Sequence, residues 1–298
     1  MKHIYLNNAF GAFPPVPGVI EAITESLQHP PRISGRDAES SSDSIGQCRE
    51  KIAQILGVAG SQVVLTPGAT YGLNTALLGL GLKRGDFVIS TVMEHNSVLR
   101  PLAHLENSLG IKVEYIQLSK GKACLDEAEY DLLLGAKPRL VVMIHASNVT
   151  GRINQISSLF KKAKSAGATT LLDASQTVGR ISVKPNELHA DIVAFSGYKG
   201  LRGPMGTGAL YVASEIELRP AFVGGTGVKS DLRLQPTEMP MRLEAGTHNV
   251  HGFAGLDAAM SCYIKYIDDI AAKERIITQN LLSGLAAVPN VRVFDNDP

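Results

Sequence analysis

The sequence lacks the features that indicate a membrane, secreted or nucleic-acid-binding protein. No stretch approaches the roughly 18 apolar residues of a membrane-spanning helix, and the opening MKHIYLNNAF has no apolar run of a signal peptide. Basic and acidic residues nearly balance, 29 against 28, so nothing indicates a nucleic acid or an anionic membrane as partner. Three scattered cysteines do not make a disulfide framework or a metal site. We therefore expect a cytoplasmic protein without a bound metal.

Two common nucleotide-binding patterns are also missing. No Gly-x-Gly-x-x-Gly follows the first predicted strand, which argues against NAD. The segment TPGATYGLN at 66–74 lacks the Gly-Lys-Ser/Thr ending of a Walker loop.

Short apolar strands alternate with helical stretches along most of the chain. Strands are predicted over 62–66, 86–92, 111–117, 139–145, 169–173, 191–195 and 206–214, and helices over 45–56, 70–80, 97–109, 126–134, 155–166, 255–267 and 271–286. This alternation favours right-handed βαβ units, so we expect an α/β fold whose mostly parallel sheet is flanked by helices. The final VRVF, at 291–294, is typical of the first strand of a smaller domain that is incomplete here.

Two predicted strands end in residues that suit pyridoxal 5'-phosphate (PLP). Lys199 stands in the turn SGYKG just past one strand, and Asp173 ends another in LLDASQ. A lysine amine is the usual nucleophile for a Schiff base, and an aspartate is the usual partner of the pyridinium nitrogen. The alternatives are a solvent-exposed lysine and an aspartate that caps a helix.

A phosphate site is predicted where the first strand meets its helix. In TPGATYGLN, Gly68 and Ala69 allow close backbone approach, and Thr70 opens a helix whose free amides attract an anion. Ser196 and Tyr198 are donors that would complete the phosphate cup. The alternative is a plain N-cap threonine.

Three further polar residues follow strand ends. His95, in MEHNSV, would stack on a pyridine ring or move protons, or would only cap the following helix. Asn148, in HASNVTG, and Gln176, in LLDASQ, would hydrogen-bond a phenolic oxygen, although Asn148 would equally serve the turn. Open α/β sheets bind ligands beyond the carboxyl ends of their strands, so these residues together point to PLP.

The segments that carry these residues resemble one family. The chain looks like the class V aminotransferase group of fold-type I PLP enzymes, and within it the cysteine desulfurase and selenocysteine lyase branch. The matching segments are YLNNA (5–9), TPGATYGLN (66–74), MEHNSVLRP (93–101), HASNVTG (145–151), LLDASQT (171–177), FSGYKGLRGPMGTGALY (195–211), FVGGTG (222–227) and EAGTHN (244–249). The resemblance implies a seven-stranded type of sheet in a large PLP-binding domain at 14–250, and a smaller α+β domain made from 1–13 plus 251–298.

The resemblance also implies the role of each residue. Lys199, His95 and Asp173 would be catalytic. The cofactor would be held by Ala69, Thr70, His95, Asn148, Asp173, Gln176, Ser196, Tyr198, Lys199 and Thr247. Thr247 would reach the phosphate of a partner subunit, so a homodimer is expected.

Three departures from the family pattern stand out. The family usually has histidine where this chain has Tyr198, whose phenol still donates to phosphate. Phe10 interrupts the usual Asp-Asn-Ala-Ala-Thr pattern near the substrate entrance. The persulfide cysteine and the carboxylate-binding arginine of the family are expected beyond residue 298, a position that the three cysteines of this chain do not occupy. Those cysteines are Cys48, Cys124 and Cys262.

The expected reaction is removal of sulfur or selenium from cysteine or selenocysteine, leaving alanine and passing sulfur to an acceptor protein. Transamination, epimerisation and β-elimination on the same scaffold are alternatives. A non-catalytic scaffold or regulator with this fold is another.

Overall fold

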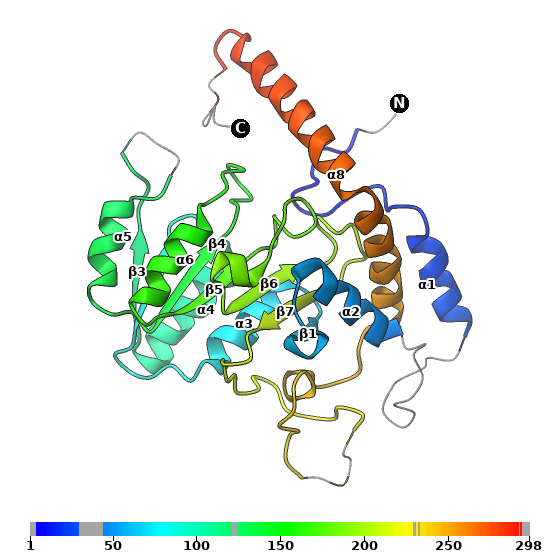
Figure 1. Cartoon of the computed structure of the whole chain (residues 1–298), viewed down its shortest axis with the longest axis horizontal. Helices are drawn as coiled ribbons and strands as arrows, with labels where there is room; N and C mark the ends of the chain where they lie inside the picture. Colours follow the sequence, from blue (N-terminus) through cyan, green and yellow to red (C-terminus); the bar gives the residue numbers. More distant parts are fainter. Residues whose placement is uncertain are drawn as a thin grey trace.

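A β-sheet forms the middle layer of the molecule, with helices on both faces (Figure 1). The computed structural model describes residues 4–29, 44–120, 124–228, 231, 233–291 and 293. Within these ranges the sheet has seven strands, in the order β1-β7-β6-β5-β4-β2-β3. They are β1 (Val63–Thr66), β2 (Phe87–Thr91), β3 (Lys112–Ile116), β4 (Leu140–Ile144), β5 (Thr169–Asp173), β6 (Ile192–Ser196) and β7 (Gly208–Val212).

Most neighbouring strands are parallel. β2 pairs in parallel with β3 and β4, and the β4–β5 and β5–β6 pairs are parallel as well. β7 runs antiparallel to β6 and β1, so β1 points the same way as β6. The carboxyl ends of all strands except β7 therefore meet at one edge of the sheet. The predicted α/β fold, with a mostly parallel seven-stranded sheet flanked by helices, is confirmed.

The helices divide between the two faces of the sheet. One face is covered by α3 (Ala69–Gly79) and α4 (Asn96–Leu109). The other is covered by α2 (Ser44–Leu56), α5 (Glu127–Leu134), α6 (Ile156–Ser165) and the beginning of α8 (Val250–Ala286). The remaining helical elements are α1 (Val19–Gln28), which packs against α8, α7 (Pro185–Leu188), and the 3-10 turns η1 (Gly60–Gln62) and η2 (Met241–Leu243).

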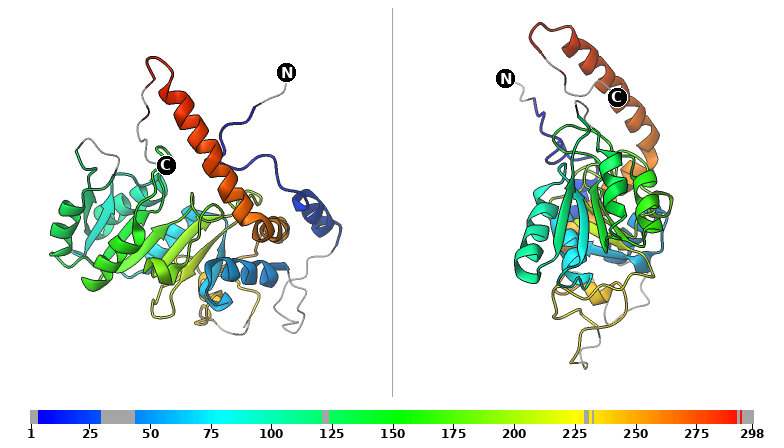
Figure 2. Two further views of the ribbon diagram at one scale, coloured as in Figure 1. Left: turned by 45° about the horizontal axis from the view of Figure 1, so that its top comes forward. Right: turned by 90° about the vertical axis from the view of Figure 1, so that its left-hand side faces the viewer.

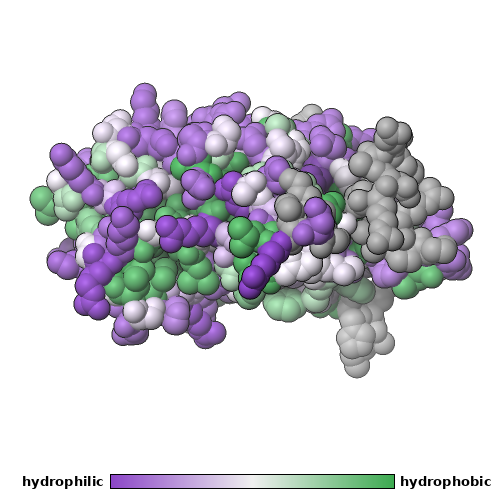
Figure 3. All heavy atoms as spheres, turned by 90° about the horizontal axis from the view of Figure 1, so that it is seen from below, coloured by the Kyte–Doolittle hydropathy of each residue, from purple (hydrophilic) through white to green (hydrophobic). Residues whose placement is uncertain are grey.

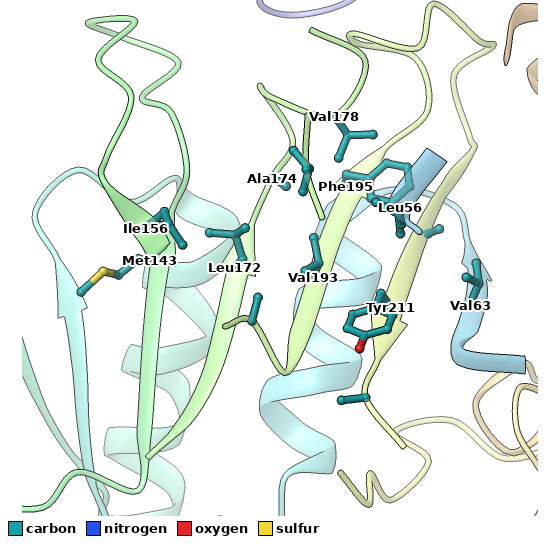
Figure 4. Close-up of a cluster of buried hydrophobic side chains, with 14 of the residues drawn as sticks. Leu56, Val63, Met143, Ile156, Leu172, Ala174, Val178, Val193, Phe195 and Tyr211 are labelled. Atoms are coloured by element: carbon teal, nitrogen blue, oxygen red, sulfur yellow. The ribbon is translucent and has the colours of Figure 1, made fainter. Parts of the chain in front are cut away.

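Both faces of the central strands are buried, which explains their continuous apolar runs. In β4, Val141 and Met143 face the α2–α6 side, whereas Leu140 and Val142 face α3 and α4. Figure 4 shows Met143 in one layer with Phe195 and other buried side chains of neighbouring strands. Strands that bury both faces have no polar side, so they read as unbroken hydrophobic segments.

The end of the chain differs from the prediction in one respect. Two helices were expected, over 255–267 and 271–286, but α8 is a single helix of 37 residues. Residues 268–270 read DDI, and without glycine or proline there nothing interrupts the backbone hydrogen bonds. The second half of α8 projects from the body of the molecule (Figures 1 and 2). Half of the strand expected at VRVF, residues 292 and 294, lies outside the described residues, and the domain boundaries stay a prediction.

The surface is mixed in polarity. On the face seen in Figure 3, hydrophilic side chains surround small hydrophobic patches. Among the described helices, none combines the length and the apolar character that crossing a bilayer requires.

Candidate active site at the carboxyl edge of the sheet

The strand ends bring most of the predicted residues to one edge. Asp173 is the last residue of β5 and Ser196 the last residue of β6. His95 follows β2 as the N-cap of α4, and Asn148 lies in the turn after β4. The edge also contains a topological switch point, because the chain runs outward from β2 to β3 and then returns to β4 on the other side of β2.

The predicted phosphate end is an open helix N-terminus. Gly68 is the N-cap of α3, has φ 154°, and supplies no side-chain cap. The Ala69 amide donates to Ser196 Oγ at 3.1 Å, so the hydroxyl of β6 sits at the start of α3. Thr70 Oγ1 is 2.7 Å from Ser97 Oγ. Thr70 is therefore not an N-cap, and that alternative is wrong.

Glycines let the backbone close around this helix start. A Cβ on Gly208 would lie 2.6 Å from Phe195 O and 2.7 Å from Gly68 Cα. Only glycine fits there, because a methyl group would collide with backbone on two sides. The backbone of β7 therefore lies close to the start of α3, where the first helix amides other than that of Ala69 suit a phosphate group.

His95 caps α4 through Nδ1, and its other ring nitrogen, Nε2, takes no part in the cap. Its Nδ1 accepts from the Ser97 amide at 3.1 Å and lies 2.8 Å from Ser97 Oγ. A chain of polar contacts thus runs from Thr70 through Ser97 to His95. His95 and Thr70 line one groove of about 380 Å³ together with Arg100 and His104. The capping role and the ring-stacking role are therefore compatible.

Asp173 and Lys199 form the electrostatic centre of the edge. Asp173 is 2% exposed, and its Oδ1 accepts from the Ser175 amide at 2.9 Å and from Ser175 Oγ. No helix follows Asp173, so the helix-cap alternative is wrong. Burial lowers the pKa of the Lys199 amine, and the charge of Asp173 partly opposes that shift. Lys199 is half-buried and so is not a fully solvated lysine.

The N-terminal segment crosses this edge. Gln176 Nε2 donates to Ala9 O at 2.9 Å, and the Ala12 amide donates to Tyr198 O at 3.1 Å. Gln176 and Tyr198 are thus tied to the segment that contains Phe10, which is 58% exposed. Asn148 is exposed, and Ser147 rather than Asn148 accepts the amides of its turn.

Thr247 lies apart from the other predicted residues. It is exposed and lines a groove of about 460 Å³ with Arg49, Glu244 and His248. Glu244 is bound in this groove by both nitrogens of Arg49, by the Leu65 amide at 2.6 Å and by His248 Nε2 at 3.0 Å. Burial alone would raise the pKa of Glu244, but the hydrogen bonds from His248 and Arg49 and their charges lower it to about 2.

Sequence reasoning missed three residues of the site. Ser97 and Ser175 hydrogen-bond to His95 and Asp173, and the available signal was a serine two residues after each of these predicted site residues. Glu94 was also missed. Its carboxyl is buried, which raises its pKa to about 8 despite hydrogen bonds from Thr91 and from the Ile144 amide. Nothing in MEHNSV distinguishes a buried glutamate from an exposed one.

The donor set fits PLP. The α3 amides with Ser196 suit a phosphate ester, and Asp173 offers a carboxylate to a ring nitrogen. Lys199 offers to an aldehyde an amine whose pKa is lowered by burial. Among the described residues no three His, Cys, Asp or Glu side chains gather as a metal site would require.

The comparisons with known proteins agree on one family. The family model described as Aminotransferase class-V matches residues 4–298. A probable cysteine desulfurase of Pyrococcus abyssi is 35% identical over 295 residues, which cover 95% of this chain and 72% of the relative.

Two solved structures have a similar fold. The apo cysteine desulfurase of Thermococcus onnurineus NA1 matches with a TM-score of 0.86 at 32% identity, over 95% of this chain and 73% of that one. The cysteine desulfurase CsdA of Escherichia coli, in an S-sulfonic acid form, matches with a TM-score of 0.85 at 29% identity. That match covers 98% of this chain and 75% of CsdA.

Proposed function

Because the chain belongs to the class-V aminotransferase family, in its cysteine desulfurase group, we propose that it is a PLP-dependent enzyme acting on cysteine or a similar small amino acid. The predicted family is thereby confirmed. The reaction would break the bond between Cβ and sulfur or selenium and leave alanine. The observation that supports this proposal most is the half-buried Lys199 amine in the field of buried Asp173, at the edge where α3 presents its free amides.

The residues of the edge divide the binding of PLP among them. The α3 amides, Thr70, Ser196 and Tyr198 would hold the phosphate, and Asp173 the ring nitrogen. Asn148 and Gln176 would hold the phenolic oxygen, and His95 would stack on the ring. When bound, PLP supplies an electron sink that stabilises negative charge at the substrate Cα.

Lys199 would do two tasks in this reaction. Its lowered pKa leaves a larger fraction of the amine unprotonated and nucleophilic, so that it holds the cofactor before substrate arrives. Once displaced, the same amine would move a proton to or from the substrate Cα. Asp173 would keep the proton on the ring nitrogen, and its bonds to Ser175 hold the carboxylate in place.

A second copy of the chain would complete the site. In one chain Thr247 lines a groove separate from the one lined by Thr70 and His95, which supports the proposal that Thr247 serves the phosphate of a partner subunit. The expected form is a homodimer.

We infer that Cys48 is not the thiol that takes the sulfur. Cys48 is fully buried, and burial raises the pKa of its thiol far above the usual range, so it is no thiolate donor. Cys124 and Cys262 are free and partly exposed, which is consistent with the proposed cytoplasmic location. An acceptor protein would take the sulfur onward.

The test is a product analysis with L-cysteine, PLP and a small dithiol as sulfur acceptor. We expect equal amounts of alanine and sulfide, and a visible absorption band from lysine-bound cofactor. Lys199→Ala removes the band and the products, whereas Lys112→Ala, which changes an exposed lysine on β3, keeps both. Pyruvate and ammonia instead of alanine would mean β-elimination. An absorption band without alanine or sulfide would instead favour a regulator that binds the ligand without turnover.

A further inference from the structure

Beyond the residues already assigned, the switch point between β2 and β4 contains a buried carboxyl group. The two strands pair only at Val88–Leu140 and Ile89–Val141, although both continue toward the carboxyl edge. Further along, the Ile144 amide of β4 donates to Glu94 Oε1 at 2.7 Å, in place of a backbone partner on β2. Glu94 therefore bridges the strands where they separate, directly before His95 in the chain.

The two oxygens of this carboxyl group have unequal surroundings. Glu94 is 7% exposed, and its Oε1 also accepts from Thr91 Oγ1 at 2.7 Å. Its Oε2 is buried and has no hydrogen-bond partner among the described residues. An ionised carboxylate would leave half of its charge at an oxygen that no donor stabilises, which is costly in a buried position. The undissociated acid carries no such charge.

Within the part of the chain that the structure describes, the charged group that acts on Glu94 is Asp173, and no cation offsets it. Asp173 at the end of β5 repels a negative charge on Glu94. Burial raises the pKa of Tyr115 on β3, and the charges of Glu106 and Glu94 add to that rise. His145, which follows Ile144 on β4, is 4% exposed, and burial lowers the pKa of its imidazole to about 4. Burial, the unpartnered Oε2 and the charge of Asp173 thus favour a neutral Glu94 at neutral pH.

We propose that Glu94 is a positioning residue whose undissociated carboxyl group ties the β2–α4 loop to β4, sets the place of His95, and leaves Asp173 as the anion of this crevice. The effect on His95 and Asp173 rests on the proposed function, because it concerns how they meet PLP. The protonation of Glu94 does not rest on it, since it follows from burial and hydrogen bonding alone.

The first experiment measures stability against pH in the chain without added PLP. A group whose folded pKa lies above its unfolded pKa stabilises the fold fully below the unfolded value, and that contribution is lost as pH rises toward the folded value. For Glu94 the window runs from about pH 4.5 to about pH 8. Compared with Glu94→Gln, the wild-type folding equilibrium constant is expected to fall by up to about tenfold per pH unit across it.

Glutamine is the suitable replacement because its Oε1 still accepts from Thr91 and Ile144. The other titrating groups, His145 included, are common to both proteins and cancel in the comparison. Asp191→Asn is the matched control. Asp191 is another buried carboxyl, but Lys164 Nζ and the Thr170 amide bind it, at 2.5 and 2.9 Å. Because a cation and an amide already face its oxygens, the Asp191→Asn comparison is not expected to reproduce the slope of the Glu94→Gln comparison.

Parallel stability curves for wild type and Glu94→Gln would overturn the proposal, because they would mean that Glu94 is ionised throughout. If the variant does not fold, infrared spectra of the wild type answer the same question. The band of an undissociated carboxyl group is expected at about pH 6 and absent at about pH 9, and no such band at pH 6 overturns the proposal equally.

The second experiment tests the positioning role with PLP added. Glu94→Gln is expected to keep the wild-type absorption maximum and affinity for PLP, whereas Glu94→Ala shifts the band and weakens binding several-fold. Equal spectra for all three proteins would remove the positioning role and leave the protonation result intact. Absence of a PLP band in the wild type itself would instead contradict the proposed function, so the two failures are distinguishable.

Discussion

Glu94 and Glu244 are equally buried, each 7% exposed, yet their pKa values shift in opposite directions. Burial raises the pKa of Glu94 to about 8. Glu244 experiences the same burial, but His248 and Arg49 bring its pKa down to about 2. The partners of a buried carboxyl group, and not its depth, decide its charge.

The difference matches the place of each residue. Glu94 lies near Asp173 at the proposed active site, where a second negative charge would compete for the ring proton of the proposed cofactor. Glu244 lies behind the loop that contains Thr247 and fixes it through an ion pair with Arg49. Glu94 stays neutral near the proposed active site, whereas Glu244 stays charged and holds the loop that contains Thr247.

The largest expected effect comes from removing the cation of the Glu244 cluster. Arg49→Met leaves Glu244 buried without its ion-pair partner, so we expect a loss of about 3–5 kcal/mol in the free energy of unfolding. Urea unfolding at neutral pH measures it. Lys51→Met on the same helix is the control, because Lys51 pairs with Asp257 in a partly exposed position and should cost about 1 kcal/mol or less. Equal losses in both variants would mean that Glu244 does not depend on Arg49.

A smaller effect is expected in acid. The pKa of Glu244 is lower in the folded state than in the unfolded state, so its contribution is present above about pH 4.5 and is lost as pH falls toward about 2. The full shift corresponds to about 3 kcal/mol. Urea unfolding of wild type and Glu244→Gln between about pH 5 and pH 3 measures the difference between them. That difference should shrink as pH falls, opposite in direction to the Glu94 comparison, and a constant difference would contradict the assignment.

The smallest effect concerns the hydroxyl that links Thr70 with His95. Ser97→Ala removes the Oγ contacts to both residues but keeps the Ser97 amide that His95 Nδ1 caps. We expect a loss of about 1 kcal/mol in stability and a weaker affinity for PLP. Ser108→Ala changes another hydroxyl of α4, bonded only to a helix carbonyl, and should leave PLP binding unchanged. Unchanged PLP binding in Ser97→Ala would exclude this link from the site.

The strands were predictable because strands that are buried on both faces are continuous apolar segments. LVVMI and IVAFS are apolar on both faces, and polar residues follow where each strand reaches the edge. The prediction of two helices in place of α8 was wrong. Residues 268–270 contain no helix breaker, and the packing of α8 against α1 and α2 is visible only in the tertiary structure.

The positions of the candidate site residues in the fold were predictable to a similar extent. Asp173, Lys199 and His95 stand beside strand ends, where local sequence is informative. The neighbours that orient them are less visible, because a serine such as Ser97 is common in loops and its contact with Thr70 joins two separate helices. Distances across a sheet do not appear in sequence spacing.

The sequence by itself determined which chemical groups are present and that the strand ends bring most of them to one edge, since parallel strands share a direction. Only the tertiary structure decided which of these groups carry charge. Glu94 and Glu244 are the same residue type, but β4 offers one a single amide at Oε1 and no donor at Oε2, whereas α2 offers the other a guanidinium. Protonation follows from those three-dimensional surroundings, because the cost of a buried charge depends on the atoms that face it.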